Sequence, residues 1–214
     1  MKKRLSIIQK IKDAIKNYMV NNYKEYLLVF VLFIIGIFIG VIILNNYGET
    51  QLMDVSTYIS DFINKFKEAE NININELILQ SIKNNTTIAL TIWFAGTTVV
   101  GIPLVLGLIF LRGLSLGYTI STCTYTLGVG KGILFNLSAL LLQNILFIPA
   151  ILTLGVSSIK LYKSILKDRR KENIKVEIIR HTIISLIMLA ILIISSFVEN
   201  TFSMFILQKI IKYF

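Results

Sequence analysis

Long apolar runs without ionisable side chains alternate along the chain with shorter segments that hold almost all of its charge. Residues 27–44, 88–111, 133–159 and 182–198 are runs of 18, 24, 27 and 17 residues without Asp, Glu, Lys, Arg or His. A transmembrane helix needs about 20 predominantly apolar residues to cross the hydrocarbon core. The pattern therefore predicts an all-α, polytopic helix bundle embedded in a membrane.

A fifth span is predicted over residues 113–130, a stretch rich in Gly, Ser and Thr. The basic loops decide this, because cytoplasmic loops contain an excess of Lys and Arg. Residues 1–26 hold seven Lys and Arg and residues 160–181 hold eight, whereas residues 45–87 hold three against six acidic residues. Five spans make both basic segments cytoplasmic. They also place the loop at 45–87 and the tail at 199–214 outside.

The outer loop at residues 45–87 contains an amphipathic pattern. Apolar residues recur there at helical spacing, namely Val55, Tyr58, Ile59, Phe62, Ile63 and Phe66. A second, weaker stripe over residues 74–82 predicts another short helix. The stripe could roof the bundle, or it could be a docking surface for an extracytoplasmic partner. For docking, the candidate residues are Tyr58, Phe62 and Phe66.

Composition narrows the class of partner. Hydrophobic residues make up 55% of the chain and charged residues 16%, against about 25% charged residues in soluble domains. The net charge of +10 is concentrated beside the spans. This distribution favours anionic membrane lipid as the partner and argues against nucleic acid. We expect the single Cys123 to be a small packing residue and the single His181 to be a structural histidine at a membrane edge.

Catalytic chemistry is not predicted. The five expected spans contain no charged residue, no carboxylate pair and no Ser with a His, and no nucleotide, metal or hydrolase motif occurs. We therefore expect a non-enzymatic protein without catalytic, cofactor-binding or metal-binding residues. The polar pair Gln143 and Asn144 falls about midway in the span at 133–159. It could form hydrogen bonds to the Thr-rich span at 113–130, or it could line a polar cavity.

Glycines and prolines inside the spans indicate how the helices pack. Pro103 and Pro149 are each expected to kink a span, because proline lacks the backbone N–H. Two GxxxG spacings occur, Gly36 with Gly40 and Gly113 with Gly117. Such spacings let helices approach closely. Packing within one chain and pairing of two copies both remain possible, so a homo-oligomer is a candidate state.

One stretch resembles a known family. Residues 92–119 are IWFAGTTVVGIPLVLGLIFLRGLSLGYT, followed by GKG at 130–132 and LLQNILFIPA at 141–150. This sequence resembles stage II sporulation protein M. The residues that match the family pattern are Gly101, Pro103, Phe110, Leu111, Arg112, Gly113, Gly117, Gln143, Asn144 and Pro149. Leu142 departs from it, because the family has a proline there.

The resemblance implies a role in engulfment during endospore formation. Similar proteins lie in the septal membrane of the mother cell. There they hold a complex with stage II sporulation proteins D and P, which degrade peptidoglycan. The resemblance thus implies a scaffold that recruits and positions wall hydrolases. The alternative is the membrane subunit of a small-solute transporter, which a wide polar cavity would favour.

Overall fold

The computed structural model describes residues 7–68, 73–137, 142–167, 171–203 and 205 of the chain. Nearly all of these residues are helical, and no strand occurs among them. The elements are α1 (Ile7–Asn21), α2 (Tyr23–Asn45), α3 (Glu49–Glu68), α4 (Ile74–Gly96), α5 (Ile102–Leu127), α6 (Val129–Asn136), α7 (Leu142–Lys167), α8 (Lys171–Val198) and the π-helical turn η2 (Glu199–Ser203). The predicted all-α membrane bundle is therefore confirmed.

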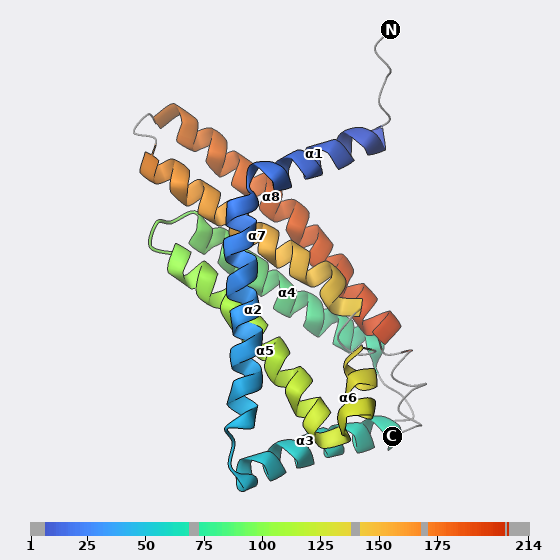
Figure 1. Cartoon of the computed structure of the whole chain (residues 1–214). Coiled ribbons are helices and arrows are strands. Elements are labelled where there is room, and N and C mark those ends of the chain that lie inside the picture. The colour runs from blue at the N-terminus through green and yellow to red at the C-terminus, as the bar shows by residue number, and fades with distance from the viewer. Residues whose placement is uncertain (1–6, 69–72, 138–141, 168–170, 204, 206–214) are drawn as a thin grey trace.

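Helices α2, α4, α5, α7 and α8 run along the bundle, as Figure 1 shows. The start of α2, the turn between α4 and α5, and the start of α8 lie at one end. Helix α3 crosses the opposite end, where α6 and the end of α8 also lie (Figure 1). Five lengthwise helices are compatible with the five expected passes, which stay a prediction. Which end faces the cytoplasm remains a prediction from the loop charges, and the end that α3 crosses is called the outer end after that prediction.

Four of the described helices are long and apolar enough to cross a membrane. They include α2, α5, residues 144–166 of α7, and a span over Ile174–Thr201 that joins α8 to η2. Helix α4 runs alongside them but is more polar, because Lys83, Asn84 and Asn85 lie within it. The chain is therefore a membrane protein in which one lengthwise helix is more polar than the others, and of these three residues only Asn85 is buried.

The helix boundaries differ from those expected over residues 88–130. A single break at 97–101 separates α4 from α5, so the predicted boundary at Arg112 is wrong. The break begins where the Thr98 hydroxyl donates to the Ala95 carbonyl at 2.9 Å and accepts from the Gly101 N–H at 3.0 Å. Pro103 then lies in the first turn of α5 rather than kinking a span, because a first-turn residue needs no intrahelical N–H bond.

Two other expected elements are also divided differently. The predicted short helix over residues 74–82 is the first part of α4. The predicted span at 133–159 is split between α6 and α7, and residues 138–141 lie outside the described part of the chain. Pro149 is inside α7, as expected, and the tail at 199–214 is described only as far as η2 and Phe205.

The main core lies where α2, α5, α7 and α8 meet. Its fully buried side chains include Val29, Val105, Ile109, Ile151 and Leu192. Gly155 of α7 faces Ile109 and Val29, so the absence of a side chain there lets three helices converge. A second, smaller cluster at the outer end joins Ile63 of α3 to Cys123 of α5 and Phe135 of α6. The predicted packing role of Cys123 agrees with this position.

Candidate functional surface and polar clusters

Helix α3 turns one edge of its apolar stripe toward the bundle and leaves the other edge exposed. Ile63 is 4% exposed and packs in the outer cluster, with Ile59 and Leu127 beside it. Tyr58 is 72% exposed and Phe62 is 44% exposed. Because successive helical residues turn by about 100°, the more buried Ile59 and Ile63 lie toward one edge of the stripe and the exposed Tyr58 and Phe62 toward the other. Part of the stripe roofs the bundle and part remains accessible.

The third docking candidate is Phe66. It belongs to the last turn of α3, but its side chain lies outside the described residues. Met53, at 71% exposure, adds another accessible apolar side chain to the same helix. The outer end of the bundle therefore presents exposed large apolar residues next to acidic ones such as Asp54 and Asp61, which are also exposed.

The four GxxxG glycines meet one another across the contact between α2 and α5. A Cβ atom on Gly36 or Gly40 would overlap the carbonyl oxygen of Phe110 or Leu114, respectively. On the facing helix, a Cβ atom on Gly113 or Gly117 would overlap the carbonyl oxygen of Phe33 or Ile37. These glycines therefore pack helices within one chain. They do not present a surface to a second copy.

The other family-matched residues belong to α5, α7 and the turn between α4 and α5, and none of them is on α3. Gly101 closes the turn before α5, where a Cβ atom would overlap the Ala95 carbonyl. Gln143 and Asn144 are at the start of α7, so the expected mid-span position is wrong, and the Gln143 side chain is outside the described residues. Instead, Asn136 of α6 donates to the Ile120 carbonyl at 3.0 Å and to the Thr124 hydroxyl at 3.3 Å in the Thr-rich stretch.

A charged cluster that sequence analysis missed lies inside the bundle toward its outer end. Arg112 is in the middle of α5, and its guanidinium carbon is 5.1 Å from the centroid of the Phe147 ring. Glu199 of η2 interacts electrostatically with Arg112 and accepts a hydrogen bond of 2.7 Å from Ser81. The expectation that no span contains a charged residue is therefore wrong. Charge within a span is tolerated when oppositely charged and polar groups surround it.

Amides and hydroxyls extend this cluster between α4 and α8. The Asn85 side-chain amide donates to the Ser196 hydroxyl at 2.8 Å and to the Leu192 carbonyl at 3.3 Å. Asn200 donates to the Ser196 carbonyl at 2.8 Å. The π-helical turn at the end of α8 brings Glu199 and Asn200 into this region. These groups form hydrogen bonds to one another, so the cluster joins α4 to α8.

A neutral polar cluster surrounds His181 near the other end. His181 is 1% exposed and is therefore enclosed by neighbouring helices, while its expected position at a membrane edge stays a prediction. Its Nε2 donates to the Trp93 carbonyl at 3.3 Å, because a carbonyl can only accept, and its Nδ1 then accepts from the Ser157 hydroxyl at 2.9 Å. We expected no Ser paired with a His within the spans, and the hydrogen bond between Ser157 and His181 corrects this expectation. Both side chains are enclosed, however, since Ser157 is 3% exposed.

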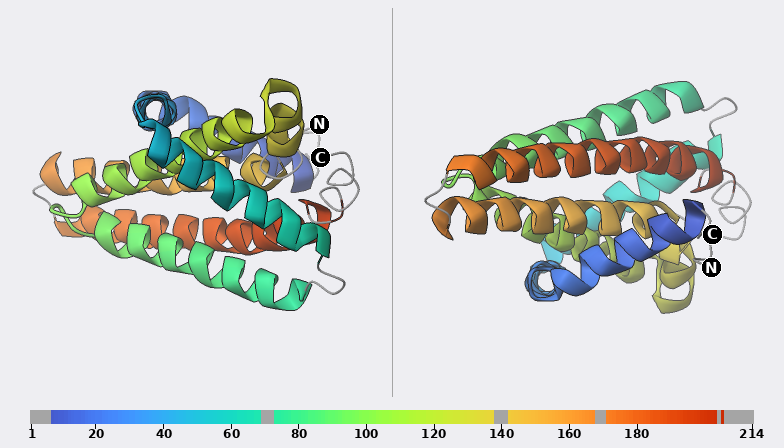
Figure 2. Two further views of the ribbon diagram at one scale, coloured as in Figure 1. Left: turned by 90° about the horizontal axis from the view of Figure 1, so that it is seen from below. Right: turned by 90° about the horizontal axis from the view of Figure 1, so that it is seen from above.

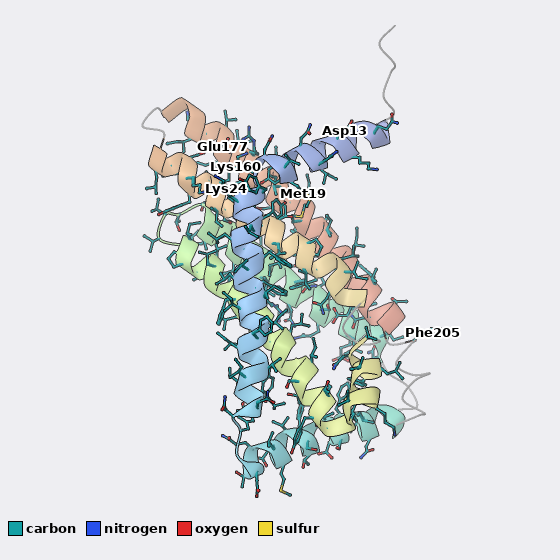
Figure 3. The ribbon with its side chains drawn as sticks, in the orientation of Figure 1. Asp13, Met19, Lys24, Lys160, Glu177 and Phe205 are labelled. Carbon is teal, nitrogen blue, oxygen red and sulfur yellow. The ribbon has the colours of Figure 1, made fainter. Side chains whose placement is uncertain are left out.

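Helix α1 is anchored at this same end. Lys160 of α7 lies over the Tyr18 ring, with 5.4 Å between its Nζ and the ring centroid, and Tyr26 meets Tyr18 edge-on at 6.5 Å. Burial raises the pKa of Tyr18 to about 12, so the phenol is neutral at physiological pH. Lys163 pairs with Glu25 and ties α7 to α2. Figure 3 shows Lys160 and Lys24 near this junction.

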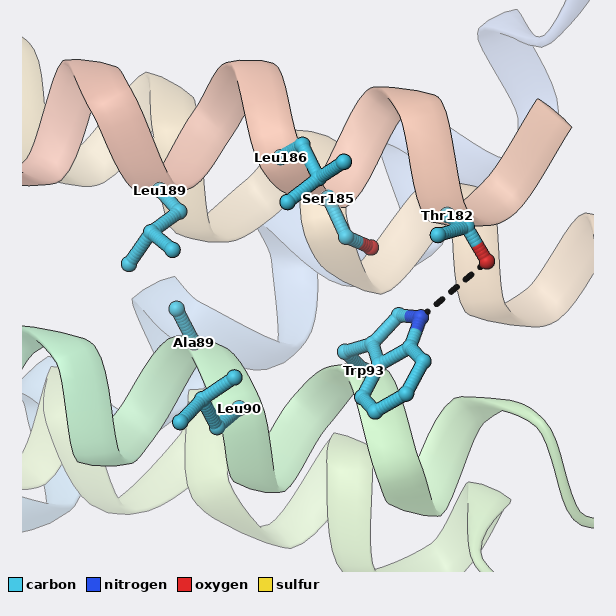
Figure 4. A pocket seen from close by; sticks show the side chains of 7 residues that line it. All are labelled: Ala89, Leu90, Trp93, Thr182, Ser185, Leu186 and Leu189. Atoms are coloured by element: carbon cyan, nitrogen blue, oxygen red, sulfur yellow. Dashed lines mark hydrogen bonds between the residues drawn. The ribbon is translucent and has the colours of Figure 1, made fainter. Parts of the chain in front are cut away.

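A pocket opens between α4 and α8, beside the His181 cluster. Figure 4 shows its lining, which is formed by Ala89, Leu90, Trp93, Thr182, Ser185, Leu186 and Leu189. The Trp93 indole N–H donates to the Thr182 hydroxyl at 3.2 Å across one end of the pocket. The lining is mainly apolar. Among the described residues, no three His, Cys, Asp or Glu side chains come together as a metal site.

These features define a class of protein, a polytopic membrane helix bundle whose internal polar groups are enclosed and whose outer end is covered by an amphipathic helix. Comparison with known families gives the assignment. The family model of stage II sporulation protein M matches residues 29–204, so the chain belongs to this family. The family is not known for an enzymatic activity. No match to a curated protein or to a solved structure was found.

Proposed function

We propose that the protein is a non-enzymatic membrane scaffold that recruits and positions peptidoglycan hydrolases at the septum during engulfment. The proposal places it in the septal membrane of the mother cell. Its partners would be stage II sporulation proteins D and P. The observation that supports it most directly is the exposure of Tyr58 and Phe62 on α3, at the end of the bundle predicted to face outside. Large exposed apolar side chains favour a protein interface.

The enclosed bundle supports a scaffold more than a transporter. A transporter subunit needs a path lined with polar groups, and Arg112 with Glu199 would be its best candidates. In the structure these groups interact with neighbouring side chains, and two pockets, one between α4 and α8 and one beside α2, have mainly apolar linings. A scaffold needs an accessible surface, and the exposed apolar side chains of α3 support this role.

The docking role is tested with Tyr58→Asp and Phe62→Asp, with Ser60→Asp as the matched control on the same exposed helix. A charge on the docking side should abolish co-purification of the hydrolases and block engulfment, since an interface aromatic is typically worth about 2 kcal/mol or more. Membrane level and thermal stability in detergent should stay near those of the control. If both aspartate variants recruit hydrolases and their cells complete engulfment, α3 only covers the end of the bundle and the docking role is wrong.

The orientation of the bundle requires its own test, because docking needs α3 outside the cell. In a Cys123→Ser background, a cysteine at Thr57 of α3 should react with an impermeant thiol reagent in intact cells. A cysteine at Lys171 should react only after permeabilisation. Labelling of the Lys171 position in intact cells would show that the predicted orientation is inverted.

A further inference from the structure

The pocket between α4 and α8 lies at the periphery of the bundle. These two helices run side by side in one outer layer, as both views in Figure 2 show. The pocket has a volume of about 140 Å³. Leu90 and Leu186 form its rim and are 49% and 61% exposed. In a membrane these rim residues face lipid, so the pocket is open to an acyl chain from the bilayer. A dry apolar cavity of about this size is large enough to hold a small hydrocarbon.

One polar group in the pocket lacks an internal partner. Ser185 is 6% exposed, and its hydroxyl has no hydrogen-bond partner among the described residues. Figure 4 shows this hydroxyl directed into the space between the two helices. The neighbouring Thr182 hydroxyl already accepts from Trp93. A buried hydroxyl without an acceptor is unfavourable. An occupant that brings an acceptor would therefore gain a hydrogen bond that the empty protein lacks.

The depth of Ser185 identifies the acceptor. Thr182 begins the charge-free part of α8, and Ser185 lies about 4.5 Å further along the helix axis. The polar interface on each side of a bilayer is roughly 5–7 Å thick, and Trp is enriched at its boundary. Trp93 and Ser185 therefore lie where the ester carbonyls of phospholipids meet the hydrocarbon. The basic residues Lys175 and Arg180 precede Thr182, on the side where headgroups lie.

We propose that this pocket binds the glycerol-ester region of a phospholipid from the leaflet at the His181 end of the bundle, which the predicted orientation makes the cytoplasmic one. The Ser185 hydroxyl donates to an ester carbonyl, and the first acyl methylenes lie against Ala89, Leu186 and Leu189. The site differs from the α3 surface, so it stands whether or not the hydrolases dock there. An ester-linked lipid would thereby join α4 to α8.

The experiment compares phosphatidylglycerol with its diether analogue, which has the same headgroup and chains but no ester carbonyl. Delipidated full-length protein in detergent is titrated with each lipid, and bound lipid is counted by native mass spectrometry. Wild type should bind the ester lipid about fivefold more tightly, as expected for one hydrogen bond. Ser185→Ala should lose this preference, while Ser115→Ala, whose hydroxyl bonds to its own helix on α5, should keep it.

Thermal unfolding gives an independent check. Without lipid, Ser185→Ala should be at least as stable as wild type, because it removes an unpartnered hydroxyl. With phosphatidylglycerol, wild type should gain more stability than the variant. Leu186→Trp, which fills the mouth of the pocket, should weaken binding of both lipids. Equal affinity of wild type for the two lipids, or a preference that survives Ser185→Ala, would overturn the proposal. A lipid-free dimer that Leu186→Trp abolishes would also overturn it, because a second copy would then occupy the pocket.

Discussion

The contact between α2 and α5 and the contact between α4 and α8 join helices by opposite means. Across the first, four glycines bring the two backbones so close that no Cβ atom fits. Across the second, side chains separate the helices and hydrogen bonds link them, as with Asn85 to Ser196 and Trp93 to Thr182. The first contact has no space for a ligand at its glycines, and the second encloses a pocket.

The difference follows from what drives helix association in lipid. Water expulsion contributes little there, so helices associate through close packing or through interhelical hydrogen bonds. Glycines maximise packing but make the contact intolerant of any larger residue. Hydrogen-bonding side chains tolerate a gap, because a few bonds can hold helices whose surfaces do not fully interlock. A site for a small occupant is therefore expected at the polar contact.

The largest expected effect is at the glycine contact. Gly117→Leu should lower the free energy of unfolding by about 3 kcal/mol, the upper end of what overpacking typically costs, because the α2 backbone at Ile37 blocks the new side chain. Circular dichroism during heating in detergent measures the loss. The matched control is Gly107→Leu on the same helix, where an added Cβ atom meets nothing within 4 Å. Equal stability of the two variants would show that α2 and α5 are not in close contact.

A smaller effect is expected at the polar contact. Asn85→Ala removes two interhelical hydrogen bonds, while Ser196 still donates to the Leu192 carbonyl at 3.2 Å. We expect a loss of about 1–2 kcal/mol, measured by the same thermal unfolding. The neighbouring Asn84 is exposed, so Asn84→Ala should change stability by less than about 0.5 kcal/mol. A loss of the same size in both variants would argue that α4 is rotated relative to α8.

The smallest effect is expected at the edge of the pocket. Trp93→Phe and Thr182→Val each remove the same hydrogen bond, so each should cost about 0.6 kcal/mol, the average for such bonds in membranes. The double variant should cost less than the sum of the two, because the bond can be lost only once. Strict additivity in this double-mutant cycle would mean that Trp93 and Thr182 do not interact.

Patterns along the chain were sufficient for several features of this protein. The charge-free runs predicted a helical membrane bundle, because hydrocarbon excludes unpaired charge wherever the residue lies in the sequence. Loop charges predicted five passes; among the described helices four are long and apolar enough to span a membrane, and the fifth pass, through α4, stays a prediction. The glycine spacing at Gly113 and Gly117 predicted close packing, although it left open whether the partner helix was in the same chain. Each of these features depends on composition or local periodicity.

The remaining features of the structure depend on contacts between residues that are far apart in the sequence. By sequence alone Arg112 is typical of a loop, since a lone charge is excluded from lipid. Phe147 and Glu199, which belong to other elements, make its position within α5 tolerable. The break at Thr98 and Gly101 had a local signal in Pro103, which fits best in the first turn of a helix. His181 and Asn85 had no such signal. Their burial and partners depend on which helices become neighbours, and only the tertiary structure determines that.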